Sequence, residues 1–229
     1  MNVPFLGAPG EMARRIGKRM LRAVTGDLAA WRAAGLDPGS VSLNVGEADF
    51  ADGKLAHRVL QRLDELSLPH SCLSIEVTES VFLGDEASLA RDALARLDAE
   101  GVKIELDDFG TGYASLTHLR AFPISRLKID LSFIRDLGRD DDSRIIVQAV
   151  IDLGHNLNFE IIAEGVETEF QAGLLRDMGC DMGQGYLFGR PAGAKQTRNT
   201  LKAETVRQRQ FLRVVAPQHN KGATMQSAQ

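Results

Sequence analysis

The feature of this sequence that most restricts its fold is a regular alternation of short strand-like runs with helical segments. A helical opening, from about Glu11 to Ala34, comes first. The runs that predict strands are VSLNV 41–45, LSIEVTE 73–79, VKIELDD 102–108, RLKID 126–130, EIIAEGV 160–166 and QGYLF 184–188. Helical patterns such as those at 54–66, 88–100 and 143–155 lie between them. This alternation is typical of a parallel α/β sheet whose strands are joined by right-handed crossovers.

Each predicted strand carries a polar residue near its carboxyl end. In LSIEV, Leu73, Ile75 and Val77 share an apolar face and Ser74 and Glu76 the other, because side chains alternate along a strand. The polar residues near the strand ends are Asn44, Glu76, Asp107 with Asp108, Lys128, Glu164 and Gln184. Solvated strand ends would explain one or two of them, but all six runs share the pattern. We therefore predict a TIM-like (β/α) barrel, incomplete because about six of its eight strands are present, with an active site at its mouth.

The polar residues at this mouth predict a site for hard metal ions. The side chains that offer only oxygen donors are Asn44, Glu76, Asp107, Asp108 and Glu164. Such donors suit Mg²⁺ or Mn²⁺ better than zinc. Adjacent aspartates normally point to opposite faces, but at the end of a strand, where the backbone turns, both can reach one cluster. Carboxylates that bridge two cations about 3.5–4 Å apart serve in-line attack on phosphate esters, and Lys128 would neutralise phosphate charge or orient the attacking water.

Composition excludes several other classes of protein. The 229 residues carry a formal net charge of −4 with scattered Lys and Arg, which argues against binding a nucleic-acid polymer. Cys72 and Cys180 have no metal-ligand spacing and suggest no disulfide framework. No apolar run has the length of a membrane segment or signal peptide, so we expect a cytoplasmic location. We expect one domain over residues 1–205 and a polar, disordered tail over 206–229.

Four longer motifs carry a resemblance to a known family. They are SIEVTES, DDFGTGYASLTHLRAFPISRLKID, IIAEGVET and GCDMGQGYLFGRP, and the likeness extends from about residue 4 to 191. They resemble the EAL-domain family, bacterial phosphodiesterases that hydrolyse cyclic di-GMP to linear pGpG. A protein-kinase interpretation of DFG fails, because no HRD-type catalytic loop or V-A-I-K strand precedes it.

The resemblance implies a role for each matching residue. Asn44, Glu76 and Asp107 match ligands of a first metal, and Asp107 with Asp108 match those of a second. Lys128 matches the lysine that contacts the attacking water. The remaining matches are Glu164 as metal-linked glutamate and general base, Gln184 beside the water, Glu79 as anchor of the loop 109–115 near the family's dimer contact, and Glu167 as a support of the metal ligands.

The sequence also departs from the family pattern. Family barrels begin with two strands, the second bearing a Glu-Ala-Leu signature whose Glu ligates the first metal, and no such segment occurs here. Gly46 also stands where the family often has Ser. These departures leave three functions open. The first is a phosphodiesterase whose missing segment is dispensable, supplied by another chain or lost through a misplaced start. The second is a degenerate relative that binds cyclic di-GMP or a protein partner, and the third is an inactive truncated product. Unpaired sheet edges would favour a homodimer or a strand-swapped oligomer.

Overall fold

A computed structural model describes residues 9–110, 116–139 and 141–215, and it contains an open parallel sheet flanked by helices. The strands are β1 (Val41–Asn44), β2 (Leu73–Thr78), β3 (Lys103–Phe109), β4 (Arg126–Ile129), β5 (Glu160–Ala163) and β6 (Met182–Gly183). The helices are α1 (Pro9–Ala33), α2 (Glu47–Phe50), α3 (Leu55–Glu65), α4 (Ala87–Ala99), α5 (Leu116–Ala121), α6 (Leu131–Arg135), α7 (Asp141–Asn156), α8 (Glu169–Asp177) and α9 (Ala194–Val215). Short 3₁₀ turns occur at η1 (His70–Cys72) and η2 (Glu79–Phe82).

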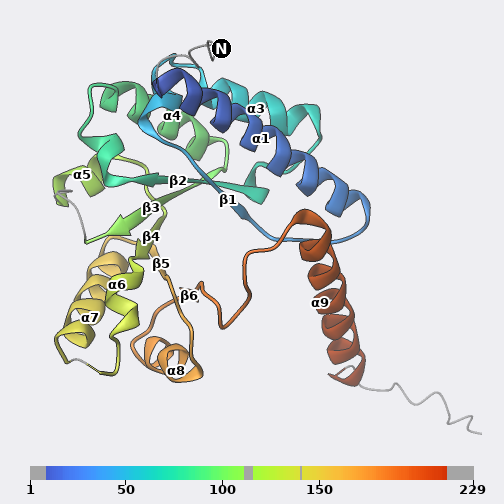
Figure 1. Cartoon of the computed structure of the whole chain (residues 1–229), viewed down its shortest axis with the longest axis vertical. Helices are drawn as coiled ribbons and strands as arrows, with labels where there is room; N and C mark the ends of the chain where they lie inside the picture. The colour runs from blue at the N-terminus through green and yellow to red at the C-terminus, as the bar shows by residue number, and fades with distance from the viewer. Residues whose placement is uncertain (1–8, 111–115, 140, 216–229) are drawn as a thin grey trace, which may run out of the picture.

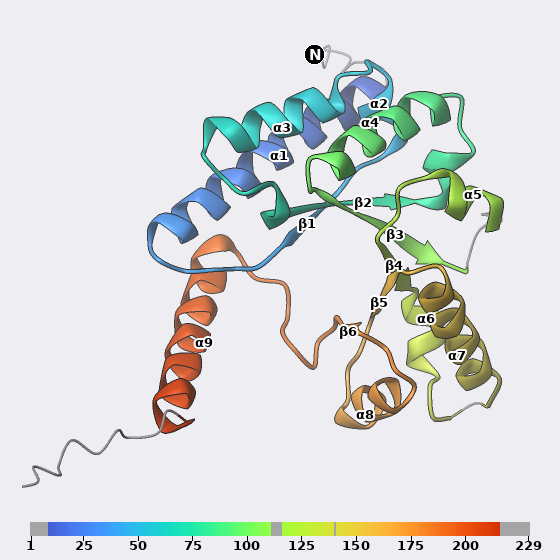
Figure 2. The same cartoon turned by 180° about the vertical axis from the view of Figure 1, so that it is seen from behind.

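The sheet follows the order of the sequence, as expected for a barrel that has not closed. Its strands pair in the order β1-β2-β3-β4-β5-β6, all in parallel, so β1 and β6 form its two edges within the described part of the chain. Helices α1, α3 and α4 flank β1 to β3, and α6, α7 and α8 lie beside β4 to β6 (Figures 1 and 2). The predicted incomplete α/β barrel is confirmed.

The hydrophobic core lies on the face of the sheet that packs against the helices. Ile75, Ile104, Leu106, Leu127 and Ile129 are completely shielded from solvent. They occupy the apolar positions of the predicted alternation, so the opposite, inner face receives the polar side chains. Burial of such apolar side chains, at roughly 1.5–3 kcal/mol each, therefore fixes which residues face the mouth of the barrel.

One predicted strand was wrong in its position. The run QGYLF at 184–188 suggested the last strand, but β6 is Met182–Gly183 and the chain turns after it. Gln184 N donates to Ala163 O and Leu187 N donates to Val166 O, so this turn folds back on the end of β5. A Cβ atom at position 185 would lie only 2.2 Å from Val166 O, and the glycine there permits this close approach.

The C-terminal part of the described chain is helical beyond the expected domain boundary. Helix α9 extends through Val215, so the boundary expected at residue 205 falls inside it, and residues 216–229 lie outside the described part. Ala194 and Leu201 in its first turns pack against the larger core cluster. Across the described residues, we find no helix with the length and apolarity needed to cross a lipid bilayer.

Candidate functional site

The polar residues predicted at the strand ends do gather at one edge of the sheet. Asn44 at the end of β1 stands in register with Glu76 on β2, and Thr78 two residues later stands opposite Asp107 on β3. Lys128 lies near the end of β4. Glu164 and Gln184 directly follow β5 and β6. We call this carboxyl-terminal edge of the inner face the mouth.

Lys128 is the centre of the mouth. Its ammonium group forms ion pairs with the carboxylates of Glu76, of Asp107 at 3.0 Å and of Glu164 at 2.5 Å. The side chain of Lys128 is 3% exposed and that of Glu76 is 8% exposed. Groups from four adjacent strands of the sheet therefore meet around a single buried cation.

A distortion of β3 brings the second aspartate to the same place. The pairing of β3 with β4 is irregular between Leu106 and Phe109, and Asp108 adopts a positive φ of 54°. Such backbone costs roughly 1–3 kcal/mol for a residue other than glycine. Here it brings Asp108 next to the carboxylates of Asp130 and Glu164, with the oxygens of these three residues within 4.8 Å of one another. Both adjacent aspartates therefore reach the mouth, in two carboxylate groups that share Glu164.

Asp130 belongs to this group but was not among the predicted site residues. It follows β4, and its carboxylate accepts hydrogen bonds from Ser132 N at 2.9 Å and from the Ser132 hydroxyl. Burial opposes ionisation of Asp130, but these two bonds keep its pKa below the usual range. The signal was present in the sequence: Asp130 stands two residues after Lys128, as the next side chain on the same face.

Three carboxyl groups of the mouth hold their protons more tightly than usual. Burial, together with the neighbouring Asp107 carboxyl, raises the pKa of Glu76 to about 7, against the opposing effect of Lys128. Burial also raises the pKa of Glu164, and burial and the charge of Asp107 raise that of Asp108. Burial would lower the pKa of Lys128, but the carboxylates of Glu164, Glu76 and Asp107 outweigh it and raise that pKa, so the ammonium stays charged.

The residues of the mouth fit a hard divalent cation. Oxygens of Glu76, Asp107 and Glu164 lie within 4.8 Å of one another, and Glu164 also belongs to the group with Asp108 and Asp130. Within the described part of the chain, Asp107 Oδ1 is buried without a hydrogen-bond partner, although Lys128 Nζ lies 3.0 Å away. The Lys128 ammonium compensates the charge of this oxygen, and a hard divalent cation could bind the oxygen in its place.

A cleft of about 480 Å³ opens beside Glu164 and includes two further predicted residues. Gln184 and Glu167 both line it. The loop that carries Glu164 and Glu167 is held by Gln171, whose Oε1 accepts from Glu167 N at 2.9 Å and whose Nε2 donates to Ile134 O at 3.0 Å. The cleft has the size of a small-ligand site, and Glu164 is the carboxylate of the mouth that lines it.

The remaining predicted site residues are less closely tied to the cluster. Glu79 is buried in η2, immediately after β2, while the loop residues 111–115 that it was expected to anchor lie outside the described residues. Asn44 is exposed at the edge strand β1, next to Glu76 in register. The structure thus places Asn44 beside the cluster and Glu79 in the turn that follows β2.

Comparison with known protein families identifies the family of this chain. The profile of the EAL domain matches residues 8–191. The chain belongs to the EAL domain family. This EAL domain is 43% identical over 183 residues to the bifunctional diguanylate cyclase/cyclic di-GMP phosphodiesterase MucR of Pseudomonas aeruginosa, an alignment that covers 80% of this chain and 26% of MucR. The chain spans about a quarter of the length of the curated relatives it matches.

Solved structures resemble this EAL domain in fold. The MucR phosphodiesterase in complex with cyclic di-GMP superimposes with a TM-score of 0.75 at 39% identity, covering 85% of this chain and 83% of that one. A manganese and cyclic di-GMP complex of BlrP1 from Klebsiella pneumoniae gives a TM-score of 0.66 at 26% identity, covering 81% of this chain and 49% of that one. The incomplete sheet therefore has the arrangement of an EAL barrel.

Proposed function

We propose that the mouth is a two-metal phosphodiesterase site for the hydrolysis of cyclic di-GMP to pGpG, with Mg²⁺ or Mn²⁺ as the cation. The observation that carries this proposal is the convergence of Glu76, Asp107 and Glu164, whose carboxylate oxygens lie within 4.8 Å of one another. The proposed ligands are Asn44, Glu76, Asp107, Asp108 and Glu164. The membership of the EAL family and the manganese and cyclic di-GMP complex of a relative support this assignment.

The side chains of the mouth have complementary roles in this reaction. Bound cations would polarise the scissile phosphate and acidify the attacking water. Lys128, charged and buried, can donate to a phosphate oxygen or to that water from a fixed position. Glu164, whose pKa is raised by burial, can accept the proton of the water, and Gln184 on the cleft wall can orient it.

The activity of residues 1–229 alone should be low. The sequence contains no Glu-Ala-Leu segment, so in this chain a first metal would have Asn44, Glu76 and Asp107 but lack the family's fourth ligand. Loss of a group that merely supports a metal ligand costs roughly 10–100-fold, so loss of a ligand should cost at least as much. We expect turnover near background, and an increase by orders of magnitude when a family first-strand and Glu-Ala-Leu segment is placed ahead of Asn2.

The deciding experiment is hydrolysis of cyclic di-GMP with Mn²⁺ or Mg²⁺, with pGpG measured by chromatography. We expect Glu164→Gln to abolish the activity of the grafted chain, whereas Glu169→Gln, an exposed residue in the first turn of α8, should leave it unchanged. Equal activities for these two variants would contradict the role of Glu164. Turnover at ordinary enzyme rates by the ungrafted chain would show that the remaining ligands suffice.

A second candidate function is binding of cyclic di-GMP or of a protein partner without turnover. The favouring observation is the open sheet, in which β1 and β6 each have one strand neighbour within the described residues. Such edges recruit partners, and we propose a homodimer or strand-swapped oligomer as one result. Light scattering at micromolar concentration should detect association. Saturable cyclic di-GMP binding to the grafted chain without pGpG would establish the degenerate alternative.

A further inference from the structure

A chain of hydrogen bonds crosses the inner face of the sheet below the mouth. Glu105 of β3 is its central member and is 1% exposed. Its Oε1 accepts from Arg126 Nη1 of β4 at 2.9 Å, and its Oε2 accepts from Ser42 Oγ of β1 at 2.8 Å. Glu105 therefore links β3 to its neighbour β4 on one side and, across β2, to β1 on the other.

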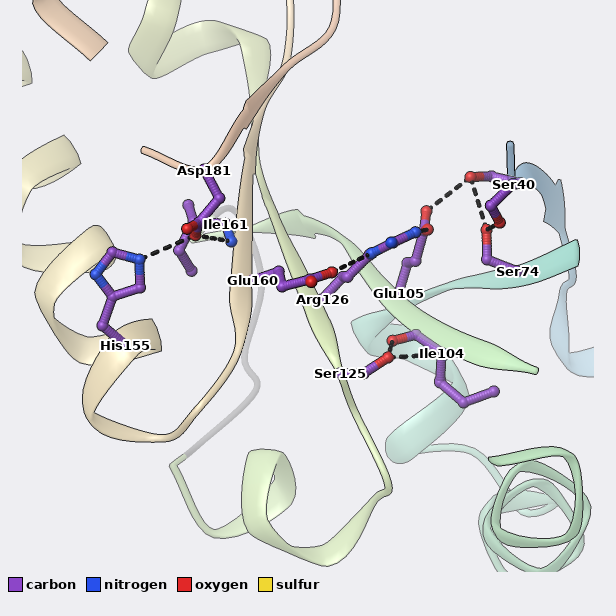
Figure 3. Close-up of polar contacts among 11 residues, drawn as sticks. Ser40, Ser74, Ile104, Glu105, Ser125, Arg126, His155, Glu160, Ile161 and Asp181 are labelled. Carbon is purple, nitrogen blue, oxygen red and sulfur yellow. Dashed lines mark hydrogen bonds and ion pairs between the residues drawn. The ribbon is translucent and has the colours of Figure 1, made fainter. Parts of the chain in front are cut away.

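Arg126 extends the chain to the next strand. Its Nε donates to Glu160 Oε2 of β5 at 2.7 Å, so one guanidinium holds two carboxylates on the two strands beside β4 (Figure 3). On the other side, the hydroxyl of Ser42 lies 3.0 Å from that of the fully buried Ser74 of β2. Five adjacent strands, β1 to β5, thus share one hydrogen-bonded ladder. We call Ser42, Ser74, Glu105, Arg126 and Glu160 the inner ladder.

The inner ladder stands in a fixed relation to the mouth. On four strands its members precede a mouth residue by two positions: Ser42 and Asn44, Ser74 and Glu76, Glu105 and Asp107, Arg126 and Lys128. Residues two apart on a strand face the same way and lie about 6–7 Å apart along it. A bond between two ladder residues therefore fixes the register and spacing of the two mouth residues above them.

We propose that the inner ladder positions the donors of the mouth for metal, with Arg126 and Glu105 as its main positioning residues. The proposal rests on the metal site proposed above. Neither residue belongs to the ligand set, so each acts only through Lys128 and Asp107, its neighbours along the strand. The planar guanidinium provides two fixed donor directions, which suits the spacing of strands on either side. A buried carboxylate with satisfied oxygens holds one geometry, because leaving it unpaired is costly.

A purely structural role for the ladder would predict a different outcome. In that case variants would lower the stability of the fold, but the metal affinity of the molecules that remain folded would not change. The measurement must therefore be the dissociation constant of Mn²⁺ for folded protein. Electron paramagnetic resonance detects free Mn²⁺ directly and needs no catalytic activity. Circular dichroism shows that each variant is folded at the temperature of the titration.

The test compares ladder variants with a control of similar stability loss. We expect Arg126→Met to weaken Mn²⁺ binding roughly 10–100-fold, as for other groups that orient metal ligands. Arg126→Lys should recover part of this loss. Ser42→Ala, which removes one bond to Glu105 from an exposed position, should weaken binding by a smaller factor and keeps the test available if Arg126→Met does not fold.

The matched control is Asp181→Asn. Asp181 Oδ2 accepts from Ile161 N at 2.8 Å and from His155 Nε2 at 2.9 Å, a tie outside the ladder (Figure 3). This variant should lose stability and retain the wild-type Mn²⁺ affinity. Unchanged Mn²⁺ affinity in the folded ladder variants, or an equal loss in Asp181→Asn, would overturn the positioning role alone. A wild-type chain that does not bind Mn²⁺ would overturn the metal site and the positioning role together.

Discussion

The inner face of the sheet carries two polar levels on the same strands, and their charges are balanced very differently. At the lower level, Arg126 faces two carboxylates, those of Glu105 and Glu160. The side chain of Glu105 is 2% exposed and both of its oxygens accept hydrogen bonds, whereas that of Glu160 is 52% exposed and can be hydrated. This level is satisfied by its own side chains and by the access of Glu160 to solvent.

At the upper level, the ion pairs of the described residues join one ammonium to three carboxylates, and two more carboxylates lie beside them. Lys128 is the cation, and the carboxylates of the two overlapping clusters are those of Glu76, Asp107, Asp108, Asp130 and Glu164. Three of these carboxyl groups have raised pKa values, with burial as the largest cause. An arrangement that leaves carboxylates short of positive charge gains stability when it binds a cation. The charges of the lower level are therefore balanced within it, and the upper level is suited to a ligand.

Removal of Lys128, the buried cation of the upper level, should have the largest effect on stability. Lys128→Met leaves the buried Glu76 and the half-buried Asp107 and Glu164 without their common partner, so we expect a loss of about 3–5 kcal/mol in the free energy of unfolding without metal. Added Mn²⁺ should recover part of it, because a divalent ion would replace the ammonium charge. Urea unfolding with EDTA and with Mn²⁺ measures both effects. A loss below about 1 kcal/mol would mean that solvent already balances these charges.

Removal of two carboxylates from the same level should abolish the response to metal. At a Mn²⁺ concentration about 100 times the dissociation constant, binding should raise the unfolding free energy of the wild type by about 2.7 kcal/mol. Asp107→Asn combined with Asp108→Asn should show no such increase, and its metal-free stability should not fall, because two like charges are removed. Thermal melts with and without Mn²⁺ test this. Equal shifts in the double variant and the wild type would rule out the metal site.

The charge imbalance also predicts a dependence of stability on pH. The pKa of Glu76 in the folded protein, about 7, lies above its ordinary value of 4.5. Between these two pH values the folded protein retains a proton that the unfolded chain has lost, so metal-free stability should fall as pH rises. With allowance for coupling to Lys128, we expect this carboxyl to account for about 2 kcal/mol.

Glu76→Gln provides the comparison for this effect. The glutamine does not titrate, so the stability of the variant relative to the wild type should increase from pH 5 to pH 8 in EDTA. Mn²⁺ should reduce the difference, because it would bind the ionised carboxylate of the wild type. Parallel pH profiles for the two proteins would show that Glu76 titrates in its ordinary range and that the upper level is not strained.

Much of the upper level could be predicted from the sequence, because it depends on local rules. Alternation of apolar and polar residues fixes the face on which Glu76, Asp107 and Lys128 lie, and strand ends meet at one edge of a parallel sheet. The same alternation puts Glu105, two residues before Asp107, on this face, but it gives no reason to connect Glu105 with Arg126. That pairing depends on the register of β3 against β4, which is set by packing between distant segments.

The errors of the sequence interpretation have related causes. The alternation in 184–188 favours a strand, yet backbone hydrogen bonds to the end of β5 turn the chain there. The bond from Leu187 N to Val166 O joins residues that are distant in the sequence, so the local pattern of 184–188 could not predict it. The positive φ of Asp108 was equally invisible, since it depends on the irregular pairing of β3 with β4. Local periodicity thus predicts which side chains meet, whereas contacts between strands decide the backbone conformation at the strand ends.

A substitution below the ladder should have the smallest effect and complete the comparison between levels. Ser125 Oγ accepts from Ile104 N at 3.2 Å and donates to Ile104 O at 3.1 Å, which ties the start of β4 to the start of β3 (Figure 3). Ser125→Ala should lower the unfolding free energy by about 1 kcal/mol, the usual contribution of such bonds, because the backbone bond from Ser125 N to Ile104 O remains. Its Mn²⁺ affinity and its pH profile should equal those of the wild type, since two further residues separate it from the mouth level. Urea unfolding together with a Mn²⁺ titration checks both statements. A loss of Mn²⁺ affinity as large as that of Arg126→Met would show that any weakening of the sheet disturbs the mouth, and the distinction between a supporting and a ligand-binding level would then fail.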